Sequence, residues 1–192
     1  MKILLAGFGP WDSHAVNPSG EVARELGGAL LPVHFGDADR ELRRLIRRRK
    51  ADALVLLGLA PSRTTLALEA VALNVDHCET PGKNKAWRRP IERDGPLAIE
   101  ARLPLEDLRL RLREAGIRAS ISHHAGTFLC NHVFYRGLRW TDGPCGFVHV
   151  PPFRALPRLR MIRAVRVILD ALGGPSPAAM PSGRRPARFP PG

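Results

Sequence analysis

Three residues of this sequence have types and surroundings that suit covalent hydrolysis: Cys130, His149 and Glu69. Cys130 stands where a predicted strand over residues 118–122 has ended and a turn through residues 125–127 leads into a helix. A cysteine at a helix start lies near unpaired backbone N–H groups and the positive end of the helix dipole, which favour the nucleophilic thiolate. The same N–H groups can hold an oxyanion. Taken alone, however, this position slightly favours a structural cysteine.

His149 lies in the segment GFVHVPP, at the end of a predicted strand over residues 146–150. Ligand sites of α/β proteins lie outside the carboxyl ends of the strands, so Cys130 and His149 can reach the same edge of a sheet. There the imidazole would act first as a base and then as an acid toward the reacting groups. For a single histidine on a strand, a hydrogen-bonded core position is the more common alternative.

Glu69 is the one charged residue in the apolar run 66–75. A buried carboxylate is costly unless it is paired or hydrogen-bonded. Such a residue either belongs to a structural network or orients a functional histidine, and the residues alone leave both interpretations open.

The elements that must position these residues follow from the apolar pattern. The run 53–57, ended by Gly58, is typical of a strand buried on both faces. Asn17 can cap a helix over 20–26, and Pro104 opens another. Strands that alternate with helices predict an α/β fold, a three-layer α/β/α sandwich with a mostly parallel twisted sheet. The other expected strands cover residues 2–6, 30–35 and 65–75, and an exposed loop covers residues 81–96. Further helices are expected over 40–50, from about 130 and over 157–172. In the last of these helices, the residues expected to face the core are Leu159, Ile162, Val165, Leu169 and Leu172.

The size and composition of the chain are those of one globular domain, with 192 residues of which 44% are hydrophobic and 25% charged. Residues 1–173 are expected to form that domain, and the Pro/Arg-rich stretch 174–192 a disordered tail. The apolar start, residues 1–7, is too short for a signal peptide, and no apolar run approaches the about 18–20 residues of a membrane span. Three scattered cysteines suit no disulfide framework. We therefore expect a cytoplasmic protein.

The formal net charge of +12 raises the question of nucleic-acid binding. Much of that charge lies in residues 40–50, where Leu42, Leu45 and Ile46 keep a helical spacing and the arginines form the solvated face. No aromatic residues interleave with the basic runs as base stacking would require, so ordinary surface charge is the favoured interpretation. A metal site is a further alternative, although the spacing fits no standard zinc pattern. Its candidate ligands are His123, His124, Cys130, His132, Cys145 and His149.

Several motifs make the sequence similar to the pyroglutamyl-peptidase type I family of cysteine peptidases. The likeness extends from the first predicted strand to about Leu172. It implies that Cys130 is the nucleophile, His149 the base and Glu69 the acid that orients it, with no metal or organic cofactor and with assembly into dimers or tetramers. The matching segments are AGTFLCNHVFY at 125–135 for the family's AGTFxCNHxxY, GFVHVP at 146–151 for GFIHVP, LEAVALN at 68–74 for PERVAIN, and AGFGPW at 6–11 with Asn17–Ser19 for TGFxPF…NPS.

The same resemblance implies release of an N-terminal pyroglutamate (5-oxoproline) from peptides through a thioester acyl-enzyme. The lactam ring is flat, compact and uncharged, so a suitable pocket has aromatic and aliphatic walls and a few backbone hydrogen bonds. The resemblance assigns the substrate-binding positions to Phe8, Trp11, Val33, Leu59, Thr80, Phe128 and Leu129.

The sequence also departs from the family pattern near the expected site. Asp12-Ser13 replaces a GG pair, residues 58–63 read GLAPSR where the family has GxAGGR, Leu68 replaces a proline, and Glu79 replaces an arginine. A charge reversal beside an active site alters substrate electrostatics and transition-state stabilisation. Two alternatives therefore stay open, a weak or inactive relative of the family and a cysteine hydrolase with a different small acyl or cyclic-amide substrate.

Overall fold

The computed structural model describes residues 1–10, 15–78 and 86–173. Trp11, Asp12-Ser13, Glu79, Thr80 and the predicted tail 174–192 lie outside these residues. The strands are β1 (Ile3–Phe8), β2 (Ala29–Leu31), β3 (Ala53–Leu59), β4 (Leu66–Leu73), β5 (Asp76–Cys78), β6 (Ala86–Arg89), β7 (Ala98–Glu100), β8 (Ala119–His124) and β9 (Cys145–Val150). The helices are α1 (Pro18–Glu25), α2 (Phe35–Arg49), α3 (Leu105–Glu114), α4 (Leu129–Trp140) and α5 (Arg158–Gly173).

Seven strands form one mixed sheet in the order β2-β1-β3-β9-β4-β7, with β8 also paired to β4. The pairs β1–β2, β1–β3, β3–β9 and β4–β8 are parallel, whereas β4 runs antiparallel to both β9 and β7. The sheet is therefore mostly parallel, and its direction changes between β9 and β4 and again between β4 and the edge strand β7. β5 and β6 pair antiparallel in a separate two-stranded sheet.

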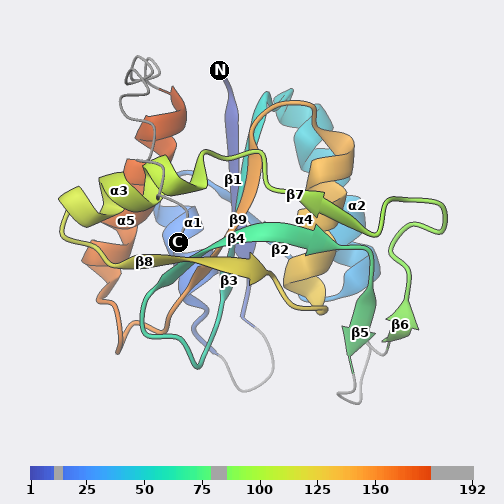
Figure 1. Ribbon diagram of the computed structural model, residues 1–192, viewed down its shortest axis with the longest axis horizontal. Helices are drawn as coiled ribbons and strands as arrows, with labels where there is room; N and C mark the ends of the chain where they lie inside the picture. Colours follow the sequence, from blue (N-terminus) through green and yellow to red (C-terminus); the bar gives the residue numbers. More distant parts are fainter. Residues whose placement is uncertain (11–14, 79–85, 174–192) are drawn as a thin grey trace, which may run out of the picture.

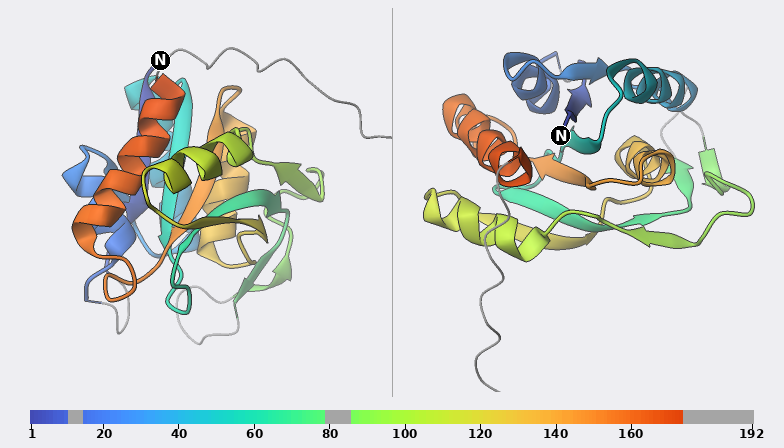
Figure 2. Two further views of the ribbon diagram at one scale, coloured as in Figure 1. Left: turned by 60° about the vertical axis from the view of Figure 1, so that its left-hand side comes forward. Right: turned by 90° about the horizontal axis from the view of Figure 1, so that it is seen from above.

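Helices cover both faces of the seven-stranded sheet, which gives the three layers that the alternating pattern predicts (Figures 1 and 2). Helices α1, α3 and α5 lie on one face, and α2 and α4 on the other. β3 is apolar throughout because its side chains alternate between the two cores. Leu54 and Leu56 contribute to the core under α2 and α4, whereas Val55 and Leu57 contribute to the other core. None of the helices in the described part of the chain is long and apolar enough to cross a membrane.

Several element boundaries differ from the sequence prediction, each because of tertiary pairing. β2 ends at Leu31, and Phe35, expected at the end of a strand, opens α2 instead. Gly58 does not end β3, because β9 pairs with β3 through Gly58 and as far as Leu59. The predicted loop 81–96 contains β6, whose pairing with β5 provides the backbone hydrogen bonds that its polar sequence does not signal.

The expected inward face of the last helix was wrong at its first position. Leu159 is 81% exposed, while Met161, Ala164 and Ile168 are fully buried beside Ile162 and Val165. The buried face of α5 thus begins at Met161, and it includes Ala164 and Ile168 beside the predicted Ile162 and Val165, with Leu169 and Leu172 partly buried.

Candidate active site

The register of β4 and β9 brings Glu69 and His149 together. In this antiparallel pair Glu69 lies opposite Phe147, so His149, two residues further along β9, is its diagonal neighbour on the same face of the sheet. The distance from His149 Nδ1 to Glu69 Oε1 is 2.7 Å. Glu69 is completely buried, and the His149 ring also packs edge-on against Phe147. The isolated carboxylate in the apolar run is therefore paired with the histidine.

Cys130 reaches the same place from the helix layer. It is the second residue of α4, whose N-cap Phe128 has an extended backbone and no side-chain capping bond, so the first N–H groups of the helix remain available near the sulfur. α4 packs against β3 and β9 on the face that carries Phe147. The Cys130 side chain lies close enough to His149 to raise the pKa of its ring. The structure thus brings together the three residues that the sequence singled out.

The surroundings of His149 favour its protonated form. Burial lowers the pKa of the imidazole, but the charge and hydrogen bond of Cys130, followed by the hydrogen bond and charge of Glu69, outweigh burial and raise this pKa to about 9. A histidine held by a carboxylate in this way can exchange a proton with a reacting group beside it.

Arg63 is a further member of the site that the sequence did not single out for this position. Its Nη2 lies 3.7 Å from Glu69 Oε1 and donates a hydrogen bond of 3.0 Å to Ser122 Oγ. Glu69 Oε2 is buried and has no hydrogen-bond partner in the part of the chain that the structure describes. Arg63 and His149 therefore supply the positive charge that offsets the burial of this carboxylate. Arg63 ends the altered loop 58–63, and only the three-dimensional structure relates that loop to Glu69.

A small apolar pocket opens beside the Cys130 sulfur. About 60 Å³ of its volume is accessible to solvent, which is enough for a few water molecules or a compact ring. Asn17, which the sequence indicated as a helix cap and as part of a family motif, is the one polar residue besides Cys130 among the described residues that line the pocket, and Asn17 Nδ2 donates to the Gly9 carbonyl at 2.9 Å. Trp11 and Thr80, also expected at the substrate site, lie outside the described residues. The pocket is lined by Phe8, Asn17, Val33, Leu59, Phe128, Leu129 and Cys130.

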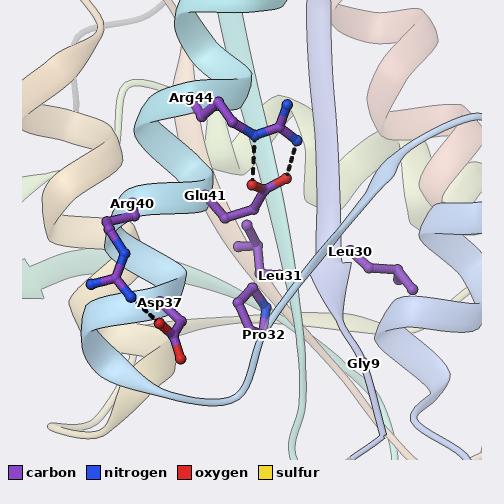
Figure 3. A pocket seen from close by; sticks show the side chains of 8 residues that line it. All are labelled: Gly9, Leu30, Leu31, Pro32, Asp37, Arg40, Glu41 and Arg44. Atoms are coloured by element: carbon purple, nitrogen blue, oxygen red, sulfur yellow. Dashed lines mark hydrogen bonds and ion pairs between the residues drawn. The ribbon is translucent and has the colours of Figure 1, made fainter.

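A second, shallower hollow lies at the sheet edge between β2 and α2 (Figure 3). Its charged side chains pair within α2, where Arg44 forms two hydrogen bonds to Glu41 and Arg40 bonds to Asp37. Because these arginines already have carboxylate partners one helical turn away, their attraction for an external anion is weakened.

The remaining candidate metal ligands do not gather with the three site residues. His123 and His124 are exposed at the end of β8, and His132 is bonded to carboxylates. Cys145 is buried, and desolvation raises the pKa of its thiol to about 12. Within residues 1–10, 15–78 and 86–173, no three histidine, cysteine or acidic side chains are grouped so as to hold a metal ion.

Gly58 is the residue that makes room for the sulfur. It lies opposite His149 in the β3–β9 pair, and a Cβ atom there would be 2.8 Å from Cys130 Sγ and 2.6 Å from the Phe147 ring. We expect Gly58→Ala to lower kcat/KM by roughly 10²-fold, because displacing a reacting atom by about 1 Å has an effect of that size. Gly36→Ala is the matched control, since the nearest atom to a Cβ at that position is 3.6 Å away. Equal kcat/KM values of the Gly58→Ala and Gly36→Ala variants would show that the position of the Cys130 sulfur does not depend on the absence of a side chain at Gly58.

A cysteine at a helix start, a histidine near a strand end and a buried carboxylate bonded to that histidine form the arrangement of a cysteine hydrolase. Comparison with known proteins then narrows the class. The family model described as pyroglutamyl peptidase matches residues 1–160. The chain belongs to this family of cysteine peptidases.

Similar proteins support this membership along most of the chain. A pyrrolidone-carboxylate peptidase of Chromobacterium violaceum is 42% identical over 164 residues, which are 78% of this chain and 77% of the relative. One of Deinococcus radiodurans is 36% identical and covers 88% of this chain and 93% of its own. The crystal structure of the Pyrococcus furiosus pyrrolidone carboxyl peptidase superimposes with a TM-score of 0.84 at 31% identity, over 89% of this chain and 97% of that one.

Proposed function

We propose that this protein is a cysteine exopeptidase that removes N-terminal pyroglutamate from peptides, with Cys130 as nucleophile, His149 as base and acid, and Glu69 as the group that orients His149. The single observation that carries the proposal is that Glu69 holds His149 beside Cys130, and that Cys130 lines the apolar pocket. The name shared by the similar proteins, pyrrolidone-carboxylate peptidase, points to the same substrate group.

In the first half-reaction the Cys130 thiolate attacks the carbonyl carbon that links pyroglutamate to the next residue. The carbonyl oxygen becomes an oxyanion, which the N–H groups at the start of α4 can stabilise. His149, protonated and held by Glu69, transfers its proton to the leaving amine as the C–N bond breaks. The products of this step are a free peptide amine and a thioester on Cys130.

In the second half-reaction water replaces the peptide. His149, now neutral, takes a proton from the water while its oxygen attacks the thioester carbon. Collapse of the tetrahedral intermediate breaks the C–S bond, which releases pyroglutamic acid and restores the thiolate beside the imidazolium. Glu69 keeps Nδ1 of the ring as a donor throughout, so the other ring nitrogen is the one that exchanges protons.

Specificity for a lactam follows from the character of the pocket. Its walls Phe8, Val33 and Phe128 are apolar, and among residues 1–10, 15–78 and 86–173 no charged side chain lines the pocket to pair with an α-amine. An uncharged ring can be buried there at little cost, whereas a protonated amine would lose its hydration without compensation.

The decisive experiment compares pyroglutamyl-aminomethylcoumarin with prolyl-aminomethylcoumarin, which has the same ring size but carries a protonated amine in place of the lactam. We expect the purified protein to hydrolyse the first substrate with a kcat/KM at least about 10²-fold higher, the discrimination that an uncompensated buried charge produces. Equal turnover of both would contradict lactam specificity. A lack of turnover of either would favour the weak or inactive relative that the altered loop 58–63 suggested.

Partners and location stay predictions. We infer that the substrates are peptides that begin with pyroglutamate, and we expect homo-oligomers and a cytoplasmic setting as the sequence suggested. The division into a catalytic domain of residues 1–173 and a tail of residues 174–192 is likewise an expectation.

A further inference from the structure

A second buried histidine on α4 is surrounded by carboxylates and has no part in the proposed reaction. His132 is 4% exposed and lies two residues after Cys130. Its Nδ1 is 2.9 Å from Oδ1 and 3.1 Å from Oδ2 of Asp76 on β5, and its Nε2 is 3.1 Å from Oδ1 of Asp39 on α2. One imidazole ring thus joins three elements of the fold.

These distances define the charge of the ring. A carboxylate only accepts hydrogen bonds, so each ring nitrogen must carry a proton to bond its partner, and a neutral imidazole has only one N–H. With Asp39 and Asp76 both ionised, these distances assign His132 the imidazolium form. Burial lowers its pKa, but the hydrogen bonds and charges of Asp39 and Asp76 outweigh burial and raise it. On the other side of the pair, burial raises the pKa of Asp39, and the bonds and charges of His132 and Arg136 lower it by more.

Two arginines complete the charge cluster around His132. Arg136, one turn further along α4, lies 2.9 Å from Asp39, and Arg89 on β6 lies 3.2 Å from Asp76. The charged groups that face the ring are thus Asp39 from α2, Asp76 from β5, and, behind these carboxylates, Arg136 from α4 and Arg89 from β6. With the imidazolium the cluster contains three positive and two negative groups, so each carboxylate has positive partners and one positive charge is in excess, with Arg89 largely exposed to solvent.

The cluster is connected to the pocket by direct contacts. Phe35 packs edge-on against the His132 ring at 5.3 Å and against the pocket wall Phe128 at 5.5 Å between ring centroids. The backbone N–H of His77, next to Asp76, donates to the carbonyl of Thr127 at 2.8 Å, in the loop that leads to Cys130. A displacement of β5 or of the start of α2 is therefore expected to displace the pocket wall at Phe128 as well.

We propose that His132 is a positioning residue: as a buried cation it clamps α2 and β5 to the first turns of α4 and so fixes the shape of the substrate pocket. The proposal rests on the proposed function, because it concerns binding at the same site. The clamp bonds neither the Cys130 sulfur nor the His149 ring. Its loss will therefore weaken substrate binding more than the chemical steps.

The pH dependence of the clamp has a defined direction. The pKa of His132 is higher in the folded than in the unfolded state, so its contribution to stability is fully present below about pH 6.5 and is lost as the pH rises through the raised value. Deprotonation leaves one ring nitrogen as an acceptor facing a carboxylate, and KM will rise over the same pH range.

The experiment measures kcat and KM against pH for the wild type and His132→Gln, with Glu92→Gln as the matched control. Glu92 forms an ion pair of 2.8 Å with Arg139 near the other end of α4, away from the pocket. We expect His132→Gln to raise KM roughly tenfold or more while kcat changes less than about threefold. The control should keep the wild-type KM and its alkaline rise, which His132→Gln should lack. A folded His132→Gln enzyme with wild-type KM overturns the proposal.

A second measurement does not depend on activity or on the folding of a variant. Nitrogen NMR of the wild-type protein with isotope-labelled histidine reports the protonation of each ring, and the pKa of His132 should lie above its ordinary value of about 6.5. A His132 ring that loses its second proton below this ordinary value overturns the clamp. If the wild type fails to hydrolyse the pyroglutamyl substrate, the proposed function fails, and the NMR result still decides whether the buried cation exists.

Discussion

Replacement of Cys130 by alanine is expected to lower kcat/KM for pyroglutamyl-aminomethylcoumarin by on the order of 10⁴-fold or more. Without the sulfur no thioester can form, and the pocket and the helix N-terminus can contribute only binding and oxyanion stabilisation. Initial rates at substrate concentrations below KM measure the effect, and circular dichroism verifies that the variant is folded.

Cys145→Ala is the matched control for this loss. Cys145 is also a cysteine on the α4 side of the sheet, but it is buried and its thiol has a pKa of about 12, so it stays protonated and unreactive. We expect this variant to remain active, and iodoacetamide to inactivate it as fast as it inactivates the wild type. Residual activity of Cys130→Ala comparable with that of Cys145→Ala would exclude Cys130 as the nucleophile.

Glu69→Gln is expected to lower kcat by roughly 10²- to 10⁴-fold, the range seen when the acid behind a catalytic histidine loses its charge. The amide preserves size and can still accept a hydrogen bond from His149 Nδ1, but it cannot stabilise the imidazolium. It can also turn its NH₂ group toward the ring and favour the wrong tautomer. kcat at saturating substrate measures the effect.

The pH dependence of kcat/KM distinguishes a role of Glu69 in stabilising the His149 cation from a purely structural role. Burial lowers the pKa of His149, and Cys130 and Glu69 together raise it to about 9, so the alkaline limb of kcat/KM in the wild type should lie near that pH. Removal of the Glu69 charge takes away part of the stabilisation of the cation, so the limb will shift to lower pH. A folded Glu69→Gln variant with the wild-type kcat and limb would contradict the assignment. The control variant Glu92→Gln, which removes a surface carboxylate, should have the wild-type kcat and the wild-type alkaline limb.

Local sequence patterns predicted where in the fold the three candidate residues lie. Cys130 at the start of α4 and His149 near the end of β9 followed from apolar runs and turn residues, and Glu69 stood out as a charge in an apolar strand. These signals are local, because a single element determines whether a residue lies at its end or in its buried part.

The parts of the site that were missed depend on distant contacts. Asn17 had a clear signal as a helix cap, but only the packing of α1 against β1 makes it a pocket wall. Arg63 belongs to a loop whose course decides that its guanidinium approaches Glu69. His132 looked like one histidine among several, since its carboxylate partners come from α2 and β5, 93 and 56 residues away in the chain.

The secondary-structure errors have a related cause. β6 and β7 are short and owe their extended backbone to pairing with β5 and β4 rather than to their own residues. Leu159 carries an apolar signal at the start of α5, yet it is exposed, and the core is instead filled from Met161 onward. The apolar pattern of a helix predicts which of its faces can be buried, and the packing of the whole fold decides which face is buried.

The antiparallel pairing of β4 with β9 makes the order of folding relevant to catalysis. His149 and Glu69 are 80 residues apart in the chain, and a slip of one residue between their strands would turn one of them to the opposite face. Contacts between such distant segments form slowly, because a long stretch of chain must be ordered first. A collapsed intermediate with its helices formed would thus have a cysteine but no working base. During refolding, recovery of hydrolysis would mark the moment at which the centre of the sheet acquires its native register.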